Sequence, residues 1–403
     1  MRSVDVIIIG ASLSGAAAAK RLVDAGLETL IIERASLPRH KICSGILSPR
    51  GHRFLLENFG PLPREVLHDP TSCRGVTFHF PSMVSFPMDF FGGTTPHLYR
   101  KFSDYWAVKR SGAEVHDRTT FTGLEDNGDH VIVHTRDREG GSVSYRAKYL
   151  IGADGPTSPV VRALYPNYPK QIPWFFVGQK LHEIIECPLD EEYFHFWFHP
   201  GLGHYTWSHA RDGKQIVGVG FKVGESFDRK QANVVRYLEE KHGVILNPQP
   251  EPDGTAENFG PSLINRYVFG KGNAIITGQA AGFLNMIGEG MSCALHSGAI
   301  AGEAIIDSNV RNRSLQELYR KMIASEVRRT SDQWNPFKVA LGRPHEADFP
   351  EAFLKLSMKD RARVLKDTWN FLLLYKEFKW GRQIIAAGAE RMLKGGYSMK
   401  EWK

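Results

Sequence analysis

The chain has 403 residues, 42% hydrophobic and 24% charged, which is the balance of an ordinary globular protein with two or three structural units. Its formal net charge of +7 would suit an anionic cofactor, an acidic substrate or a membrane surface, and a solvated basic surface is the simpler explanation. The sequence has no long block of lysine or arginine and no nucleic-acid-binding motif, so DNA and RNA are not expected as partners.

The four cysteines are far apart in the sequence and form no C-x-x-C pair. This spacing argues against a disulfide framework and a zinc site, and it favours a reducing compartment. The first predicted strand begins at residue 4, so we expect no signal peptide, and no stretch of about 20 apolar residues could span a membrane. The sequence therefore predicts a cytoplasmic protein.

The chain begins with the order strand, glycine turn, helix and strand. Residues 4–9 are an unbroken apolar run, residues 10–15 read Gly-Ala-Ser-Leu-Ser-Gly, and residues 16–22 begin with four alanines. A second apolar run at residues 27–33 ends in Glu33. This order is typical of a dinucleotide-binding βαβ unit, in which the helix N-terminus binds a pyrophosphate. A parallel βαβ unit that binds no nucleotide is the alternative.

Individual positions give this unit its chemistry. Gly10 permits the sharp turn, Gly15 lets the helix pack close to the strand, and the Glu33 carboxylate can accept hydrogen bonds from ribose hydroxyls. Ser12 occupies the position where the pattern usually has its middle glycine. The nucleotide prediction therefore depends on the order of the elements more than on the glycine pattern alone.

A basic, irregular loop over residues 34–50 leads into a helix expected at residues 51–57. Cys43 lies among the cations of this loop, where their field should favour the thiolate, and a buried loop cysteine is the alternative. Alternating apolar and polar residues predict sheet over residues 74–91, and residues 97–110 are expected to form a helix.

The middle of the chain is predicted to be mostly β-structure. Residues 119–149 read as a meander, and residues 149–155 read as a short strand followed by a second turn of glycine and acid. Residues 174–223 predict an antiparallel sheet with one aromatic face. His195 and His199 would share a strand face there, but no carboxylate or cysteine accompanies them, so packing is preferred to a metal site.

The last third begins with a strand and a third small-residue turn over residues 272–282. A helix rich in small residues follows at residues 288–307, where close approach of the backbone to a ligand or a neighbouring helix is expected. The chain is predicted to be helical from residue 314 onward. Two amphipathic pieces with basic flanks, residues 353–358 and 369–375, could pack on the main body or lie on a membrane surface.

Three glycine-rich turns thus follow three apolar strands, near residues 10, 152 and 278. In this order and spacing they resemble the FAD-binding fold of aromatic-hydroxylase-type flavoproteins, and most closely the geranylgeranyl reductase family, over roughly residues 1–310. The resemblance implies an α/β fold with a Rossmann-like three-layer FAD-binding domain, an antiparallel-sheet substrate domain and a C-terminal helical region. The expected boundaries are 1–73 with 98–170 and 265–310 for the FAD-binding domain, 74–97 with 171–264 for the substrate domain, and 311–403 for the helices.

The same resemblance implies a set of cofactor-binding residues. These residues are Gly10, Ser12, Leu13, Ser14, Gly15, Glu33, Arg34, Lys41, Ser44, Gly45, Arg100, Asp154, Gly155, Gly278, Gln279, Ala281, Gly282, Gly288, Glu289 and Gly290. The catalytic candidates are Cys43, in a cysteine–glycine loop beside the flavin ring, and Tyr205 and Trp207, in the tyrosine–tryptophan motif of the substrate sheet. No metal site is expected.

Five positions depart from the family pattern. Ser12 and Ser44 each replace a glycine, and Gln279 replaces an aspartate that usually holds a ribityl hydroxyl. A glutamine can still make that hydrogen bond without the charge. His209 and Ala210 replace the phenylalanine–proline pair that usually ends the tyrosine–tryptophan motif, so the prenyl substrate has less support than the cofactor.

The implied cofactor is FAD, with NAD(P)H as a transient electron donor. The leading hypothesis is reduction of a carbon–carbon double bond in a hydrophobic prenyl or related substrate, with a proton from Cys43 or from a water in its loop. Backbone N–H groups of residues 288–290 would stabilise an anionic reduced flavin. The alternatives are a monooxygenase acting on an aromatic or lipid-like substrate and a flavin-free binding protein on the same fold. Peripheral membrane contact through the C-terminal helices is a further hypothesis.

Overall fold

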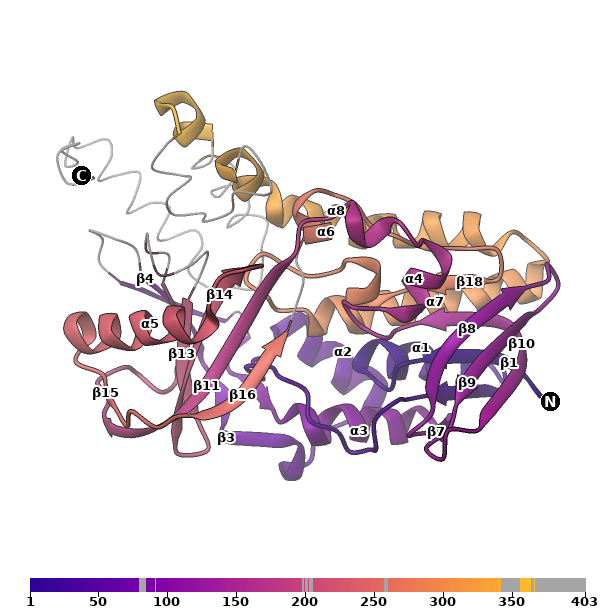
Figure 1. Ribbon diagram of the computed structural model, residues 1–403, viewed down its shortest axis with the longest axis horizontal. Helices are drawn as coiled ribbons and strands as arrows, with labels where there is room; N and C mark the ends of the chain where they lie inside the picture. Colours follow the sequence, from indigo (N-terminus) through magenta and orange to yellow (C-terminus); the bar gives the residue numbers. More distant parts are fainter. Residues whose placement is uncertain are drawn as a thin grey trace.

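The computed structural model describes residues 1–79, 85–90, 92–197, 199, 202, 206–256, 260–341, 356–363 and 366. Figure 1 shows two sheets at opposite ends of the molecule, with the helices α1, α7 and α8 packed beside the sheet that contains both β1 and β10. The predicted α/β fold with a Rossmann-like sheet is confirmed.

The first sheet has eight strands, and its central strands run in the order β17-β18-β10-β1-β2-β7. The strands are β1 Arg2–Ile9, β2 Thr29–Ile32, β7 Glu114–His116, β8 Thr120–Asp126, β9 Val131–Arg136, β10 Ser142–Gly152, β17 Gly270–Lys271 and β18 Ala274–Ile276. Strand β1 pairs in parallel with both β10 and β2, whereas β9 pairs antiparallel with β10. Strand β2 is buried throughout, which explains its continuous apolar run.

Helices α1 and α7 pack against each other without a large side chain between them. A Cβ atom built on Gly298 would lie 2.2 Å from the Ser14 carbonyl oxygen, and one on Gly302 would lie 2.8 Å from that of Ala18. Small residues at these positions therefore let the two backbones approach. The helices of this part are α1 Leu13–Asp24, α2 Pro49–Phe59, α3 Arg100–Ser111, α4 Pro159–Leu164, α7 Met291–Arg311 and α8 Leu315–Leu341.

The second sheet also has eight strands, in the order β15-β11-β14-β13-β12-β4-β5, with β16 beside β11. They are β4 Gly75–His79, β5 Phe86–Asp89, β11 Phe175–Glu186, β12 Tyr193–Trp197, β13 Thr206–Arg211, β14 Lys214–Lys222, β15 Ile245–Leu246 and β16 Glu251–Ala256. One face packs on α5, Phe227–His242, and includes Trp197. The other face carries Phe194, Phe196 and Trp207, because side chains alternate along a strand.

The remaining elements are short and lie outside the two large sheets. They are β3 Leu67–Cys73, β6 Thr95–Leu98, α6 Gly260–Leu263 and the 3₁₀ turns η1 Arg64–Val66, η2 Tyr168–Lys170 and η3 Gly278–Ala281. The helix expected from residue 97 begins at Arg100 instead, because the residues before it pair with β3 as strand β6. Strand β12 ends at Trp197, so the prediction that His195 and His199 share a strand face is wrong.

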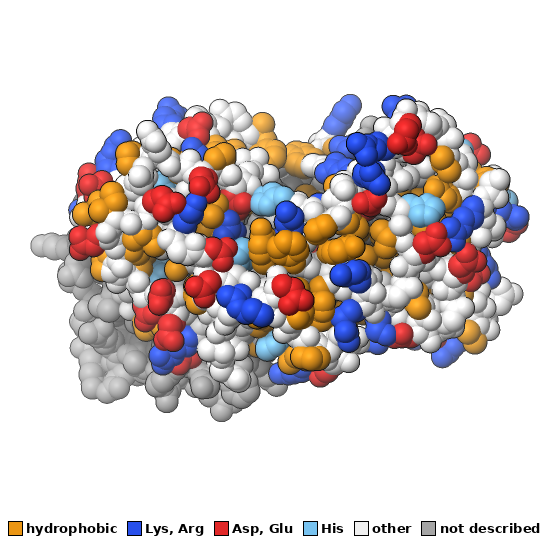
Figure 2. Space-filling model, turned by 90° about the horizontal axis from the view of Figure 1, so that it is seen from below, with side chains coloured by type: hydrophobic (Ala, Val, Ile, Leu, Met, Phe, Trp, Pro, Cys, Tyr) orange, Lys and Arg blue, Asp and Glu red, His pale blue; other side chains and the backbone are white. Residues whose placement is uncertain are grey.

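Helix α3, which lies at the lower edge of Figure 1, carries basic side chains that contact aromatic rings. Three of its cations lie over three of its aromatic rings, namely Lys101 over Phe102, Lys109 over Tyr105 and Arg110 over Trp106. The face seen from below carries hydrophobic side chains across its middle with lysine and arginine around them (Figure 2). Part of the basic charge therefore covers aromatic surface.

Within the described residues, no helix is long and apolar enough to cross a membrane. The same residues contain no group of three histidine, cysteine, aspartate or glutamate side chains that could hold a metal ion. The amphipathic piece predicted at residues 369–375 lies outside the described residues, as does the first half of the piece at residues 353–358.

Candidate functional site

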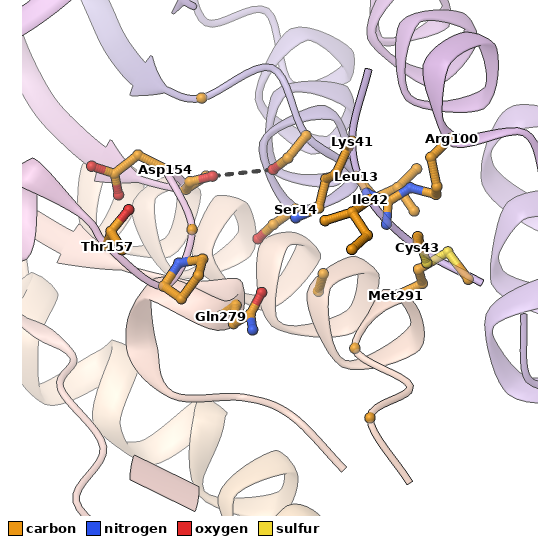
Figure 3. Close-up of a pocket in the computed structure, with 18 of the residues that line it drawn as sticks. Leu13, Ser14, Lys41, Ile42, Cys43, Arg100, Asp154, Thr157, Gln279 and Met291 are labelled. Carbon is orange, nitrogen blue, oxygen red and sulfur yellow. Dashed lines mark hydrogen bonds between the residues drawn. The ribbon is translucent and has the colours of Figure 1, made fainter. Parts of the chain in front are cut away.

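A cavity of about 730 Å³ extends from the carboxyl ends of β1, β2 and β10 to the aromatic face of the second sheet. In open α/β sheets, ligands bind at this end of the strands. Figure 3 shows Asp154 and Gln279 on one side of the cavity, Cys43 and Arg100 on the other, and Ser14 between them.

The first turn is built from close backbone contacts. Gly10 has φ of 110°, and a Cβ atom there would lie 2.5 Å from the Ala153 carbonyl oxygen. Ser12 caps helix α1, because its Oγ accepts a hydrogen bond from the Gly15 N–H at 3.3 Å. The same hydroxyl donates to the Ala153 carbonyl oxygen at 3.1 Å. The serine that replaces the middle glycine therefore links the first turn to the second.

The second and third turns each present a buried polar atom without a hydrogen-bond partner. Asp154 Oδ2 accepts from the Val160 N–H at 3.1 Å, whereas its Oδ1 has no partner. Burial raises the pKa of Asp154 to about 6. Gln279 Nε2 is buried and unpartnered as well, and both residues line the cavity. Buried polar atoms are normally hydrogen-bonded, so these two favour a polar ligand.

Glu33 is 5% exposed and is fixed by neighbours on both sides. Its Oε2 accepts from the Ala11 N–H at 3.0 Å, and its Oε1 accepts from the Ala35 N–H at 2.9 Å. Arg39 Nε donates to Glu33 Oε2 at 3.3 Å, and Arg39 Nη2 donates to the Ala11 carbonyl at 2.9 Å. The sequence reasoning missed Arg39, whose only signal was its place among several loop cations.

Arg100 opens helix α3 and makes a buried bidentate ion pair with Asp104, at 2.7 Å and 2.9 Å. Burial disfavours the charged form of Arg100, but Asp104 and Cys43 act in the opposite direction and raise its pKa. Burial likewise works against the Asp104 carboxylate, yet Arg100 and Arg39 keep its pKa below the ordinary value. Cys43 is among the groups that raise the pKa of Arg100, so the fixed guanidinium and the thiol lie near each other.

The loop around Cys43 is fixed to the second sheet through its backbone. The Ser44 carbonyl accepts from His97 Nε2 at 2.9 Å and from His209 Nε2 at 3.1 Å. Gly45 has φ of 84°, and a Cβ there would lie 2.5 Å from the Leu98 carbonyl oxygen. The histidine that departs from the family pattern at position 209 therefore has a structural partner in this loop.

At the start of α7, the backbone N–H groups of residues 288–290 were expected to face the flavin. The Gly288 N–H donates to the Asn285 carbonyl at 3.1 Å, and the Glu289 N–H donates to Asn285 Oδ1 at 2.8 Å. These two N–H groups are already bonded within the protein, so the expectation that the N–H groups of residues 288–290 stabilise an anionic ring stays a prediction for Gly290 alone. The Glu289 carboxylate accepts from the Ser292 N–H at 2.8 Å and caps α7.

The predicted cofactor-binding residues divide into two groups. Fifteen line the cavity, namely Gly10, Ser12, Leu13, Ser14, Glu33, Arg34, Lys41, Ser44, Arg100, Asp154, Gly155, Gln279, Gly288, Glu289 and Gly290. The other five, Gly15, Gly45, Gly278, Ala281 and Gly282, do not line it. Gly278, for example, has φ of 62° and packs against the Ser14 side chain.

Of the catalytic candidates, Cys43 and Trp207 line the cavity, whereas Tyr205 lies outside the described residues. The sequence reasoning missed Gln179, Thr157 and Met291, which line the cavity too. Thr157 and Met291 lie within two residues of predicted cofactor-binding positions, which was a signal for them, whereas Gln179 lies on strand β11 far from any motif.

Comparison with known proteins agrees with this geometry. Residues 97–183 match the family model described as FAD binding domain. Digeranylgeranylglycerophospholipid reductase 1 of Methanosphaera stadtmanae is 28% identical over 339 residues, which cover 80% of each chain. A second enzyme of that name, from Methanopyrus kandleri, is 28% identical over 361 residues, covering 84% of this chain and 85% of the relative.

Solved structures share the fold. A geranylgeranyl bacteriochlorophyll reductase-like protein of Thermoplasma acidophilum has a TM-score of 0.69 and 19% identity, over 91% of this chain and 96% of that one. The myxobacterial chondrochloren halogenase also has a TM-score of 0.69, with 18% identity over 90% of this chain and 88% of that one. The chain is therefore a FAD-dependent oxidoreductase. Within that class it is similar to proteins named as reductases of geranylgeranyl compounds, in agreement with the resemblance that the sequence motifs carry.

The residues of the cavity fit FAD. The unpartnered Gln279 amide and Asp154 carboxylate oxygen can bond to hydroxyl groups of the cofactor. At the N-terminus of α1, backbone and dipole favour a pyrophosphate. The Glu33 carboxylate lies at the end of β2, where a ribose is expected.

Proposed function

We propose that the protein reduces a carbon–carbon double bond of a prenyl or related hydrophobic substrate. The observation that carries this proposal is the composition of the cavity beyond the flavin turns. The side chains that the second sheet contributes there carry no charge; they are Val76, Phe90, Phe176, Val177, Gln179, Phe194, Phe196, Trp207 and Thr255. Such a wall suits an apolar chain better than a polar or ionic substrate.

The reaction adds a hydride and a proton across the double bond. Reduced FAD, when bound, supplies the hydride, and NAD(P)H is the proposed donor that reduces it again by transient binding. The aromatic wall would hold the substrate against the flavin and exclude water from it. Trp207 contributes to this wall from β13. Tyr205 is proposed as a second residue that contacts the substrate, as its sequence motif implies.

We assign the proton to the Cys43 thiol, with a water in the same loop as the alternative. Cys43 is half-buried in the cavity, where the apolar wall and the flavin-binding residues meet. Its sulfur accepts from the Gly45 N–H at 3.4 Å, and the Arg100 guanidinium lies near enough to interact with it electrostatically. The thiol would give its proton to the substrate carbon, and Arg100 would stabilise the thiolate until solvent restores the proton.

Anaerobic turnover tests the proposal. Enzyme reduced beforehand is mixed, without oxygen, with a panel of prenyl lipids and aromatic compounds, and reoxidation of the flavin is followed by absorbance. We expect a prenyl compound to reoxidise the flavin and to be recovered with one double bond fewer. Substrate-dependent oxygen consumption without anaerobic reoxidation would support a monooxygenase instead. A purified protein without a flavin spectrum would exclude both enzymes.

A further inference from the structure

Gln179 has a position that the proposed chemistry does not explain. It lies on β11, is 1% exposed and lines the cavity. Its Nε2 donates to Asp253 Oδ2 at 2.5 Å and to the Cys43 carbonyl at 3.2 Å. Its Oε1 accepts from Trp207 Nε1 at 3.3 Å and from Ser44 Oγ at 3.4 Å. The amide thus uses its two donors and both acceptor positions.

These partners come from three separate parts of the chain. Cys43 and Ser44 belong to the loop after β2, Trp207 lies on β13, and Asp253 lies on β16. Gln179 therefore connects the proposed proton donor to the proposed substrate wall through one side chain. A carboxylate could not replace it, because an ionised carboxylate has no donor for the Cys43 carbonyl.

Arg211 and Asp253 close the network around the same carbonyl. Arg211 Nη1 donates to the Cys43 oxygen at 3.1 Å, and Arg211 Nη2 lies 3.2 Å from Asp253 Oδ2. The side chains of Arg211 and Asp253 are 8% and 7% exposed. The Cys43 carbonyl thus accepts from two side chains on different strands, so the Cys43 backbone is held from two directions, although the buried Arg211 Nε has no partner.

We propose that Gln179 is a positioning residue. It holds the loop that carries the Cys43 thiol at a fixed place relative to Trp207 in the cavity wall. The predicted effect of Gln179 on turnover rests on the proposed function. Its predicted effect on the position of the Cys43 loop holds whatever reaction the protein catalyses. A reacting group displaced by about 1 Å can lose about 100-fold in rate, so a single lost amide is sufficient to matter.

The first test compares Gln179→Met with Gln215→Met. Gln215 is a matched control, because it is 2% exposed in the same sheet, donates to Ser208 Oγ at 2.6 Å and does not line the cavity. We expect Gln179→Met to retain bound FAD while iodoacetamide modifies Cys43 about tenfold faster, because the loop is released. Anaerobic reoxidation by substrate should fall about 10- to 100-fold. The control should change neither rate.

The second test uses Gln179→Glu and pH. A protonated carboxyl group keeps the shape and one donor, whereas the ionised form has none and faces the Asp253 carboxylate. Burial and this neighbour raise the pKa of the introduced group, so the reoxidation rate of the variant should recover as the pH falls. The unsubstituted enzyme should show no such recovery.

The outcomes separate the two proposals. Unchanged alkylation and reoxidation rates in Gln179→Met would overturn the positioning role. If Gln179→Met does not fold, a rate in Gln179→Glu that is independent of pH overturns it equally. Faster alkylation in Gln179→Met, in an enzyme that no prenyl compound reoxidises, would support the positioning role and reject the proposed reaction.

Discussion

The two ends of the cavity are built in different ways. At the nucleotide end, three turns meet through backbone contacts so close that a Cβ atom at Gly10 or Gly15 would clash with a carbonyl oxygen. At the substrate end, the Cys43 loop is held by side chains from other strands, among them Gln179 and His209. One end thus depends on the absence of side chains, and the other depends on particular buried polar ones.

This difference shows which changes each end can tolerate. A turn fixed by backbone packing accepts a polar replacement such as Ser12, because its hydroxyl caps α1 and bonds to Ala153. A loop held by buried polar side chains needs each partner, since a buried group left unpaired costs about 1–3 kcal/mol.

Gly298→Ala should strongly destabilise the nucleotide end. The added Cβ would lie 2.2 Å from the Ser14 carbonyl oxygen, so α7 must move away from α1. We expect a loss of about 3 kcal/mol in the free energy of unfolding, measured with urea on the apoprotein. Gly123→Ala is the control, because its nearest neighbour would be His134 Cδ2 at 3.9 Å. Equal stability of the two variants would show that the close packing does not matter.

Cys43→Ala should reduce turnover without removing the cofactor. Loss of a positioned acid typically lowers the rate by about 100-fold. Flavin absorbance of the purified variant and single-turnover reoxidation measure the two effects. Cys187→Ala is the control, because Cys187 packs beside α5, away from the cavity. A Cys43→Ala variant with full activity would remove the thiol from the mechanism.

Acidification should change the free energy of unfolding in opposite directions through titratable groups at the two ends of the cavity. Burial lowers the pKa of His97 to about 4, so the unfolded chain binds more protons below pH 6.5 and stability is lost as the pH falls. Between pH 7 and pH 5 this loss is about 2 kcal/mol. Burial raises the pKa of Asp154 to about 6, so this carboxyl group binds its proton more tightly in the folded protein than in the unfolded chain. Its protonation therefore adds to the free energy of unfolding as the pH falls from 7 to 5.

Urea unfolding of two variants at pH 7 and pH 5 checks these signs. His97→Gln should lose less stability on acidification than the unsubstituted protein, because its side chain does not titrate. Asp154→Asn should lose more, because the compensating protonation is gone. The same change in both variants would show that the two groups do not control the acid response.

Gln279→Ala should weaken FAD binding about tenfold and leave the apoprotein as stable as before. The reason is that its Nε2 has no partner within the protein, so its removal breaks no bond of that atom until the cofactor is present. The dissociation constant is measured by flavin fluorescence, with the exposed Gln249→Ala as the control. A destabilised apoprotein with unchanged affinity would contradict the assignment.

The nucleotide end was predictable because its signals are local. The order of strand, turn, helix and strand and the positions of Gly10, Gly15 and Glu33 can be read along one short segment. Strands end and helices begin where nearby residues dictate, so the sequence alone determined the fold class and the three turns. The local sequence did not show that the N–H groups of Gly288 and Glu289 donate to Asn285.

The tertiary structure alone decided the substrate end. Gln179, Arg211 and Asp253 are separated in sequence by tens of residues and carry no shared motif. Gln179 and Arg211 nevertheless both donate to the Cys43 carbonyl, and Asp253 accepts from Gln179 and pairs with Arg211. Their meeting depends on the register of β11 with β14 and β16, which is set by many backbone pairs across the whole sheet. The sequence therefore predicted where the cofactor would bind, and long-range strand pairing decided which side chains hold the Cys43 loop.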